Sequence, residues 1–296
     1  MPAAVLIVNP FASRVTPDLT LAVEAELAAA GTVETVLTER PLHAVELAEA
    51  AGREFERVYV FSGDGGFNEV VNGLAADVPV GFIPGGSTSV LPRALGVPRD
   101  PVQAARALAR SSAERRISLG RVNGRRFTFS AGLGIDAELI RRVDALGRAT
   151  GRRAGDVAFA RALAGIFAER RARFDPVMEV EGLGRVAFAL VANGDPYSYV
   201  GRVPLRVAPR AEFELGLDLV APRELRARRL PQVGRWVLAG KGQERSPHVL
   251  YVHDADELTI RSDQPVPLQV DGEDLGDVAE AHFEAERAAL RVIVRE

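Results

Sequence analysis

The chain has 296 residues, 47% of them hydrophobic and 26% charged, with a formal net charge of −3. This composition is typical of a globular protein with a sizeable core, and the length suits one large domain or two ordinary ones. The charge gives no reason to expect nucleic acid as a partner, and the absence of cysteine excludes disulfide frameworks and thiolate metal sites.

The sequence carries no sign of a targeting or membrane-spanning segment. The opening stretch "MPAAVLIVNPF" has no basic region before its apolar run, and the run is too short for a signal peptide. No stretch approaches the roughly 18 apolar residues of a membrane span. We therefore expect a cytoplasmic protein.

The first 120 residues alternate strand-like and helix-like patterns. Apolar runs at 4–8, 33–38, 57–61 and 78–83 predict buried strands, and the segments 19–31, 43–52, 67–74, 88–96 and 101–110 predict helices. Strands that are apolar on both faces and alternate with helices indicate a doubly wound parallel sheet covered on both sides.

The pattern changes from about Arg115. Asn123-Gly124 between two apolar runs predicts a β-hairpin. Helices are predicted between 136 and 173 and at 224–239, and strands at 177–181, 186–192, 203–207, 215–220, 248–252, 257–261, 266–270 and 289–294. Many short strands favour an antiparallel β-sandwich or open barrel. We predict an α/β domain over 1–120 and a β-rich domain over 121–285, with the strand at about 286–296 returning to the first domain.

The stretch "SGDGGFNEVVNGL", 62–74, joins a predicted strand to a predicted helix through a glycine-rich turn. Such turns bind phosphate, because free N–H groups and the helix dipole point outward; a plain turn with glycines at positive φ is the alternative. Asp64 stands inside this turn. A carboxylate repels phosphate unless a divalent cation stands between them or it accepts a hydrogen bond from the ligand. The combination indicates a site for a magnesium-bound nucleotide.

A second glycine turn follows the next strand. In "PGGSTSVLPRALG", 84–96, three hydroxyl residues come after Gly85-Gly86 at a helix start. They serve either as helix caps or as a second anion cradle. Asn9, Pro10 and the pair Ser13-Arg14 follow the first strand. The loops after parallel strands share one sheet edge, which is where ligands of open α/β sheets bind.

The turn "VDGE", 270–273, places Glu273 directly after an apolar strand run. It is either an exposed acidic turn or a carboxylate held at the active edge. In the second case Glu273 accepts the proton of an attacking hydroxyl.

These stretches, together with "NPFAS" (9–13) and "AGLGIDAELI" (131–140), resemble in their order the diacylglycerol kinase catalytic family of lipid kinases. The resemblance implies a nucleotide domain like that of phosphofructokinases and NAD kinases, followed by a lipid-substrate domain. It implies transfer of the γ-phosphoryl group of ATP, with Mg²⁺, to the hydroxyl of a diacylglycerol-like or sphingoid lipid.

The resemblance also assigns roles. Asp64 and Glu273 are the expected catalytic residues, with Glu273 as general base, and Asp64, Glu214 and Asp218 are the expected magnesium ligands. The expected nucleotide-binding residues are Asn9, Pro10, Ser13, Arg14, Ser62, Gly63, Asp64, Gly65, Gly66, Asn68, Glu69, Gly86, Ser87, Thr88 and Arg93.

The chain departs from the family pattern at several motif positions. Ser62 replaces a glycine and Gly66 a threonine, and the pair Ser89-Val90 stands where Asn-Asp is usual. Pro92 replaces an alanine, and Leu215 an acidic residue. The loss of threonine and aspartate ligands weakens nucleotide binding, changes its geometry, or marks an altered substrate.

Segment 141–173 carries nine arginines against three acidic residues, together with apolar side chains. Basic and apolar helix faces suit an anionic membrane surface, and a solvated helix packed on the second domain is the alternative. We therefore expect a lipid substrate met by peripheral contact at the inner membrane face, with a homodimer left open.

Two other functions remain open at this point. One is a soluble kinase like the NAD kinases, acting without lipid or detergent. The other is a non-catalytic lipid- or nucleotide-binding homologue whose motifs have drifted.

Overall fold

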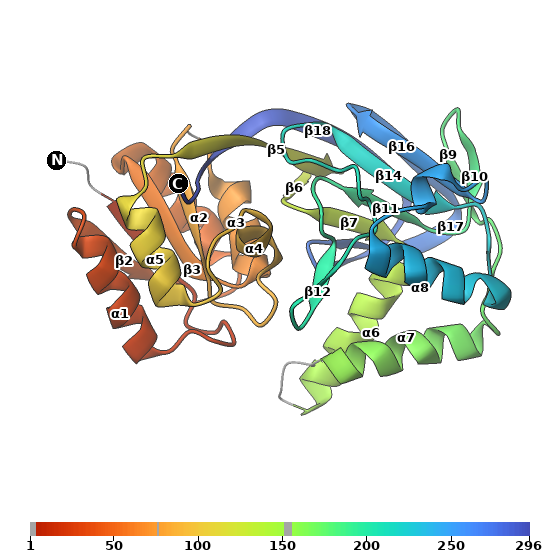
Figure 1. The fold of residues 1–296 in the computed structure, drawn as a ribbon, viewed down its shortest axis with the longest axis horizontal. Coiled ribbons are helices and arrows are strands. Elements are labelled where there is room, and N and C mark those ends of the chain that lie inside the picture. Colours follow the sequence, from red (N-terminus) through yellow and green to blue (C-terminus); the bar gives the residue numbers. More distant parts are fainter. Residues whose placement is uncertain (1–3, 76, 151–155) are drawn as a thin grey trace. The chain divides into compact units, whose positions relative to one another are not determined.

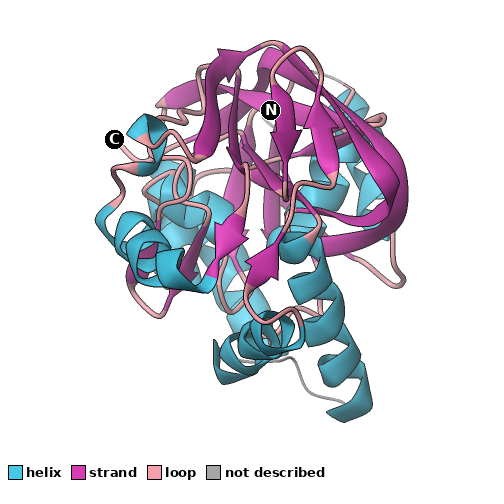
Figure 2. Ribbon diagram, turned by 90° about the vertical axis from the view of Figure 1, so that its right-hand side faces the viewer, coloured by secondary structure: helices cyan, strands magenta, loops and turns pink. Residues whose placement is uncertain are grey.

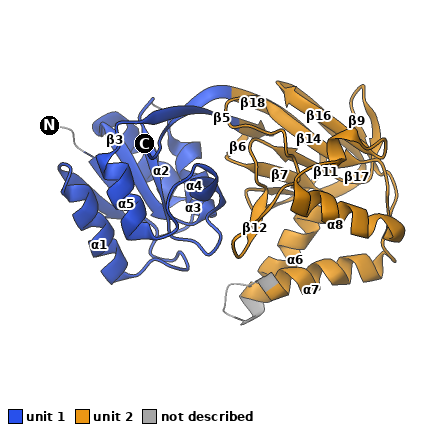
Figure 3. Cartoon of the chain, viewed as in Figure 1, with its two compact units in different colours: residues 1–119, 287–296 blue, residues 120–286 orange. Residues whose placement is uncertain are grey.

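The computed structural model describes residues 4–75, 77–150 and 156–296. The chain forms two compact units, coloured separately in Figure 3. The first contains Met1–Leu119 and Arg287–Glu296, and the second contains Gly120–Glu286. The sequence placed the corresponding boundaries at 120 and about 286. No helix in the described ranges is long and apolar enough to span a membrane.

The first unit is a parallel sheet with helices on both faces. Its strands are β1 (Ala4–Val8), β2 (Val33–Leu37), β3 (Arg57–Ser62) and β4 (Val80–Pro84), in the order β4-β3-β1-β2. Its helices are α1 (Pro17–Ala28), α2 (His43–Glu54), α3 (Asp64–Gly73), α4 (Val90–Ala94) and α5 (Pro101–Arg110). Helix α1 packs on α5 and α2 on α3, one pair on each face (Figure 1). The predicted α/β class is confirmed.

Local signals explain where these helices begin. The Thr16 hydroxyl accepts a hydrogen bond from the Leu19 amide, and Pro17 starts α1. Asp100 accepts one from the Gln103 amide, and Pro101 starts α5. Side-chain caps and proline in the first turn both favour helix initiation, because the first amides have no partner within the helix.

The second unit is mostly β, as predicted. Its main strands follow the order β16-β14-β11-β7-β17-β18 in an antiparallel sheet, seen with its helices in Figure 2. The elements from residue 114 onward are β5 (Glu114–Val122), β6 (Arg125–Phe127), β7 (Ser130–Leu133), α6 (Ile135–Thr150), α7 (Asp156–Glu169), β8 (Arg173–Phe174), β9 (Met178–Val180), β10 (Gly184–Val186), β11 (Ala189–Ala192), β12 (Ser198–Val200), β13 (Val203–Leu205), β14 (Leu217–Pro222), β15 (Leu225–Arg226), α8 (Leu230–Ala239), β16 (Val249–Ala255), β17 (Glu257–Val270) and β18 (Glu273–Ile293).

Two strands, β5 and β18, carry the chain from one unit to the other. Strand β18 pairs with β17 in the second unit, and its Val292 pairs in parallel with Val80 of β4 in the first. The Ser111 hydroxyl donates to the Val294 carbonyl at 2.7 Å, and the Val294 amide donates to the Ala113 carbonyl at 3.1 Å. The segment after the second unit therefore completes the first unit.

Two sequence predictions were wrong in extent. Strand β18 was expected only at 289–294, yet it begins at Glu273, because the segment from Glu273 pairs with β17, with Ala281 and Phe283 buried and His282 between them not. The helix expected at 224–239 begins only at Leu230, because residues 225–226 pair as β15 with β8. In addition, the two runs at 257–261 and 266–270 form one strand, β17, whose register shifts between Arg261 and Val266.

Candidate functional site

Three loops of the first unit meet at the carboxyl ends of β1, β3 and β4. The Asn9 amide donates to the Phe61 carbonyl at 3.0 Å, and the Gly85 amide donates to the Ser62 carbonyl at 2.7 Å. The Arg14 amide donates to the Gly85 carbonyl at 2.9 Å. These main-chain bonds join the loops that the sequence predicted to share one edge.

The glycines of these loops are required by close packing. A Cβ at Gly86 would lie 2.9 Å from the Gly63 Cα, and one at Gly85 would lie 2.7 Å from Val15 Cγ2. None of Gly63, Gly65, Gly85 and Gly86, all in the described part of the chain, has a positive φ. The alternative of a plain turn with left-handed glycines is therefore wrong. Gly85 and Gly86 let two loop backbones approach each other.

Ser62 and Gly66 are packed against each other. A Cβ at Gly66 would lie 2.1 Å from Ser62 Oγ, so the serine side chain fills the space that a side chain at 66 would take. Ser62 is 1% exposed, and its hydroxyl has no hydrogen-bond partner among the described residues. The two departures from the family motif are thus linked: this chain has its hydroxyl side chain at position 62, where the motif has it at position 66.

Asp64 is the first residue of α3, and its carboxylate caps another helix. Its Oδ1 accepts hydrogen bonds from the amides of Val90 at 2.7 Å and Leu91 at 3.4 Å, the first two residues of α4. Pro92, the third, has no amide hydrogen and needs no partner. The carboxylate among the glycines therefore has donors within the protein itself, and it fixes the second glycine loop relative to the first.

Helix α3 presents an uncapped N-terminus at this edge. Its N-cap residue, Gly63, has no side chain, and no side-chain cap bond is formed there. The first amides of a helix have no intrahelical acceptor, and the helix dipole adds partial positive charge. A phosphate fits this position, because main-chain donors face it without an intervening side chain.

Two predicted nucleotide residues on α3 make contacts inside the protein. Asn68 is fully buried, and its Oδ1 accepts from the Asn72 side-chain amide at 3.2 Å. Glu69 Oε2 accepts from the Ala44 amide at 3.2 Å, near the start of α2. The Asn68 bond thus lies within α3, whereas the Glu69 bond ties α3 to the start of α2.

The remaining predicted residues of the first unit lie on the loops. Arg14 Nη1 donates to the Arg99 carbonyl and Arg93 Nη1 to the Thr88 carbonyl, each at 3.4 Å. Each guanidinium is therefore held near a backbone carbonyl of the first unit by a long hydrogen bond. Of these predicted residues, Pro10, Ser13 and Ser87 are exposed.

Glu273 lies in the second unit, directly after a tight hairpin turn. Asp271 and Gly272 have φ values of 48° and 84°, and the Val270–Glu273 pair closes the turn between β17 and β18. Arg125 Nη2 donates to Glu273 Oε2 at 2.9 Å. This ion pair holds the predicted base at the start of its strand.

The turn at 270–273 was interpreted either as an exposed acidic turn or as a carboxylate held at the active edge. Asp271 does not fit the first of these, because it is buried. It is 4% exposed, and Oδ2 accepts from the Thr128 amide at 2.7 Å and the Thr128 hydroxyl at 2.9 Å. Oδ1 accepts from the amides of Phe129 at 3.0 Å and Ser130 at 3.2 Å. The aspartate therefore ties the Glu273 turn to the segment between β6 and β7.

The acidic residues predicted to hold a structural magnesium ion, Glu214 and Asp218, differ in burial. Asp218 is fully buried: Oδ2 accepts from the Tyr251 hydroxyl at 2.6 Å, and Oδ1 meets His253 Nδ1 at 2.8 Å and the Asp254 amide at 3.1 Å. Glu214 is exposed. The described residues contain no group of three His, Asp or Glu side chains placed to hold a metal. Asp218 holds β14 to β16, and the assignment of this pair of acids to a metal stays a prediction.

Asp136 was not among the predicted site residues, and it is linked to the Glu273 turn through Gln269. The Tyr197 hydroxyl donates to Asp136 Oδ1 and Gln269 Nε2 donates to Asp136 Oδ2, each at 2.6 Å. Gln269 Oε1 in turn accepts from the Gly272 amide at 2.8 Å. Burial raises the pKa of Asp136 above its ordinary value. The segment 131–140 was noted for its likeness to the family, but no sequence pattern marks a buried acid.

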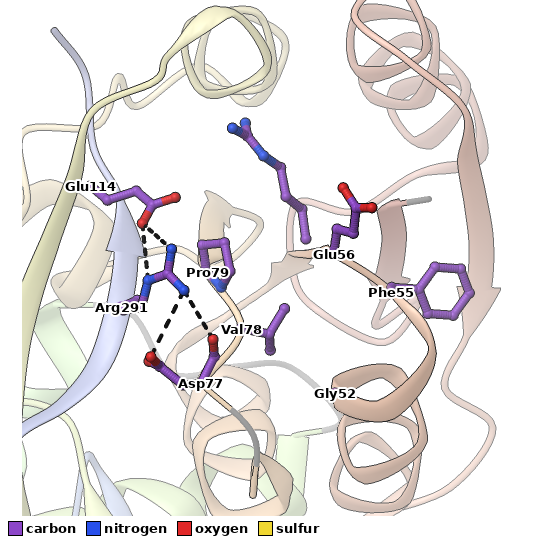
Figure 4. A pocket seen from close by; sticks show the side chains of 9 residues that line it. Gly52, Phe55, Glu56, Asp77, Val78, Pro79, Glu114 and Arg291 are labelled. Carbon is purple, nitrogen blue, oxygen red and sulfur yellow. Dashed lines mark hydrogen bonds and ion pairs between the residues drawn. The ribbon is translucent and has the colours of Figure 1, made fainter. Parts of the chain in front are cut away.

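A hollow of the first unit lies away from the glycine loops, by the amino ends of β3 and β4 (Figure 4). Arg291 Nη2 bonds Glu114 at 2.6 Å there, and Nη1 donates to the Asp77 carbonyl at 3.1 Å. None of its lining residues is a predicted site residue. This hollow is separate from the candidate site.

The fold and the loops at the carboxyl ends of β1, β3 and β4 define a class of protein. In this class a parallel α/β unit, with glycine loops of the kind that bind phosphate, is followed by a mostly β unit. Comparison with known proteins supports the resemblance. Residues 3–122, less than half of the chain, match the diacylglycerol kinase catalytic domain. The resemblance seen in the motifs is confirmed for this part of the chain.

Individual relatives agree with this assignment. A diacylglycerol kinase of Bacillus subtilis is 44% identical over 94 residues, 31% of this chain and 31% of the relative. A second curated relative, from Streptococcus pneumoniae, is 34% identical over 116 residues, 38% of this chain and 39% of its own length. The matched stretches thus span about a third of these relatives.

Solved structures show that the fold likeness extends further. A crystal structure of a diacylglycerol kinase from Bacillus anthracis has a TM-score of 0.74 at 18% identity and covers 99% of this chain and 97% of that one. Another structure from the same organism has a TM-score of 0.78 at 23% identity, with the same coverage. At these identities the likeness shows the fold alone, and it confirms the two-part architecture.

Proposed function

We propose that this protein is an ATP-dependent lipid kinase that phosphorylates the hydroxyl of a diacylglycerol-like or sphingoid lipid. The observation that carries the proposal is the pair of interlocked glycine loops beside the uncapped N-terminus of α3, in a segment that matches the diacylglycerol kinase catalytic domain. ATP, when bound, supplies the γ-phosphoryl group. Phosphoryl transfer depends chiefly on positioning and charge neutralisation, which main-chain donors and nearby arginines provide.

The residues of the first unit divide this work. The amides at the start of α3 bind phosphate oxygens, and Gly86 keeps the second loop close enough for its backbone to join them. Arg14 and Arg93, on the flanking loops, offset phosphate charge. Asp64 keeps the loops together through α4. A magnesium ion carried by the nucleotide needs only one or two protein carboxylates, and Asp64 is the residue that would provide one.

Glu273 is the proposed general base. A carboxylate at the start of β18, fixed by Arg125, can accept the proton of the lipid hydroxyl as the oxygen attacks phosphorus. The hydrogen-bonded turn beneath it limits its movement. The proposed proton acceptor is therefore the carboxylate of Glu273, whose Oε2 is held by Arg125.

Helix α7 is the proposed contact with the membrane. Val157 is 73% exposed, and Phe159 and Leu163 are each 37% exposed. Arg161, on the same helix, is exposed as well. Apolar side chains beside a basic one favour the interface of an anionic bilayer. Arg152 and Arg153, counted in the basic segment, lie outside the described residues.

Two arginines at the end of this segment, Arg170 and Arg173, already have partners within the protein. Arg170 bonds Glu138 at 2.8 Å and lies 5.6 Å from the Phe174 ring centroid, and Arg173 bonds Asp175 at 3.0 Å. The exposed apolar side chains of α7 are therefore the better residues to change in a test of membrane binding. Val157→Glu should reduce binding to vesicles containing anionic lipid several-fold, whereas Leu183→Glu, at an exposed turn elsewhere, should not. Equal binding by both variants and the wild type would remove the membrane proposal.

The catalytic proposal is tested with labelled ATP and a lipid panel. Diacylglycerol, monoacylglycerol, a sphingoid base, ceramide and a polyprenol are offered in mixed micelles, with NAD as a soluble acceptor. We expect label in at least one lipid. Glu273→Gln should lower kcat by at least a hundredfold, while Glu280→Gln, on the same strand but paired with Arg261, should not.

Other outcomes decide for the alternatives. Label in NAD alone would identify a soluble kinase. ATP binding without transfer to any acceptor, and no effect of Glu273→Gln, would identify a non-catalytic binding protein. A folded protein that binds no ATP would contradict the nucleotide site itself.

A further inference from the structure

Two side chains of helix α6, Asp136 and Arg141, are bonded to the segment around Glu273, one through a single intervening side chain and one directly. Helix α6 packs on β7 and β17, and it belongs to the second unit, as the turn at 270–273 does. The proposed phosphoryl transfer assigns a role to neither side chain. Their bonding partners show that one helix holds the chain on both sides of the proposed base.

The Asp136 carboxylate packs closely against the backbone of β7. A Cβ at Gly132 would overlap Asp136 Oδ2, so the glycine leaves the space that this carboxylate fills. Gly132 of β7 pairs with Gln269 of β17, which places Gln269 next to the same carboxylate. Tyr197 bonds Oδ1 and Gln269 bonds Oδ2, each at 2.6 Å. Both oxygens of Asp136 therefore accept hydrogen bonds, and the orientation of the carboxylate is fixed.

Gln269 connects this acid to the turn through its side-chain amide. It is 1% exposed; Nε2 donates to Asp136 Oδ2 at 2.6 Å, and Oε1 accepts from the Gly272 amide at 2.8 Å. The Gly272 N–H can only donate, so the oxygen end of the Gln269 amide must face the turn. The nitrogen end then faces Asp136 Oδ2, which is an acceptor. Both ends of Gln269 therefore have matched partners, and Gly272 is fixed relative to α6.

Arg141 bonds the residue on the other side of Glu273. Its Nε donates to Asp274 Oδ2 at 2.7 Å, and its Nη2 donates to Asp274 Oδ1 at 2.9 Å. Nη2 also donates to Asp277 Oδ1 at 2.7 Å. A two-point pair between arginine and a carboxylate restrains direction as well as distance. Arg141 therefore restrains Asp274, which directly follows Glu273 in the chain.

We propose that α6 positions the general base, with Gln269 and Arg141 as the positioning residues. This inference rests on the proposed function, in which Glu273 accepts the proton of the lipid hydroxyl. Gly272 and Asp274 flank Glu273, and restraining both neighbours limits the directions that the Glu273 side chain can take. Reacting atoms must lie within about 3–3.5 Å of each other, so a small displacement of the base lowers the rate strongly.

Two substitutions test the inference with labelled ATP, a lipid acceptor and the full chain. Gln269→Met keeps a similar volume and removes both hydrogen bonds, and Arg141→Ala removes the pair with Asp274. Each should lower kcat about tenfold and leave the KM for ATP within about twofold, because the proposed nucleotide site lies in the first unit. Arg141→Lys keeps the charge but loses the two-point pair, so it should lower kcat by less than Arg141→Ala.

Gln243→Met and Arg261→Ala are the matched controls. Gln243 is also a buried glutamine, and its Nε2 donates to two backbone carbonyls outside the Glu273 turn, each at 3.0 Å. Arg261 also pairs with two carboxylates, those of Glu181 and Glu280. Both controls lose bonds of the same kind in the same unit, and their kcat should stay within about twofold of the wild type.

Gln269→Glu separates positioning from general stability through pH. Its carboxylate still accepts from the Gly272 amide, but its second oxygen meets Asp136, and two ionised carboxylates at this distance repel each other. A proton shared by the two acids restores the hydrogen bond, and this proton is lost as pH rises. The Tyr197 bond to Asp136 is common to both proteins. The ratio of variant to wild-type kcat should be near one at about pH 6 and fall about tenfold by about pH 9.

Hydrogen exchange supplies a readout that needs no turnover. The peptide over 270–276 should exchange faster in Gln269→Met and Arg141→Ala than in the wild type, and at the wild-type rate in both controls. Wild-type kcat in both folded variants, a pH-independent ratio for Gln269→Glu, or unchanged exchange in this peptide would overturn the inference. Transfer of label to no lipid by the wild type would contradict the proposed function instead, and the exchange result would still decide whether α6 holds the turn.

Discussion

The exchange between Ser62 and Gly66 yields a prediction that depends on distances. A Cβ at position 66 would lie 2.1 Å from Ser62 Oγ and 2.9 Å from Ser62 Cβ, far inside contact distance. Gly66→Thr should therefore destabilise the protein by about 1–3 kcal/mol, the range of an overpacked core. The side chain cannot move away freely, because Ser62 is buried in β3.

The reciprocal change, Ser62→Gly, has a different effect on the free energy of unfolding. Ser62→Gly places glycine within a strand, which costs about 0.5–1 kcal/mol. It also removes a buried hydroxyl without a partner in the described structure, which offsets part of that cost. The double variant removes the overlap and restores the family arrangement, so it should be more stable than Gly66→Thr alone.

Urea unfolding of the wild type, both single variants and the double variant forms a thermodynamic cycle. We expect a favourable coupling energy of about 1–3 kcal/mol between the two positions, as found for residues in contact. The affinity for MgATP should change in parallel with stability: it should fall in Gly66→Thr and recover in the double variant. If the two single effects add within about 0.5 kcal/mol, the reasoning from steric exchange is refuted.

Three further predictions concern carboxylates. Asp64→Ala should cost about 1–2 kcal/mol in urea unfolding through loss of the α4 cap, and Asp64→Asn less, because it keeps an acceptor. Equal costs would refute the capping role. Arg125→Ala should lower kcat about tenfold with the KM for ATP unchanged, unlike Arg126→Ala, which breaks an ion pair with Glu286; similar effects would contradict positioning of Glu273. Burial raises the pKa of Asp195 to about 6, above its unfolded value of about 3.8, so stability should fall as pH rises from about 4 to 6. Asp195→Asn should flatten this slope in urea unfolding at several pH values, and an unchanged slope would contradict it.

The sequence predicted the first unit well because its signals are local. The run at Val58–Phe61 is apolar on both faces, so it indicates a buried parallel strand without further context. Residues 101–110 begin with proline after an aspartate cap, and the helix follows those bounds. Most of β18 was missed, because Glu280, His282 and Glu284 dilute the apolar pattern and only pairing with β17 makes it a strand.

The site could be located from the sequence, but not explained from it. Glycine turns after neighbouring strands mark the edge, because sheet geometry fixes where such loops meet. The partner of Asp64 lies 26 residues away, and no spacing rule connects it to the Val90 amide. The burial of Asp218 depends on Tyr251 and His253 from β16, so its assignment as a metal ligand could not be judged beforehand.

The return of residues 287–296 to the first unit has a consequence for biosynthesis. A ribosome releases Met1–Leu119 well before these residues, which follow the whole second unit. The sheet edge at Val80 therefore stays unpaired until Val292 has been synthesised. The first unit cannot reach its final form during its own translation. The order of synthesis thus makes the first unit depend on completion of the second, and a nascent chain stopped within the second unit exposes an unpaired edge to aggregation.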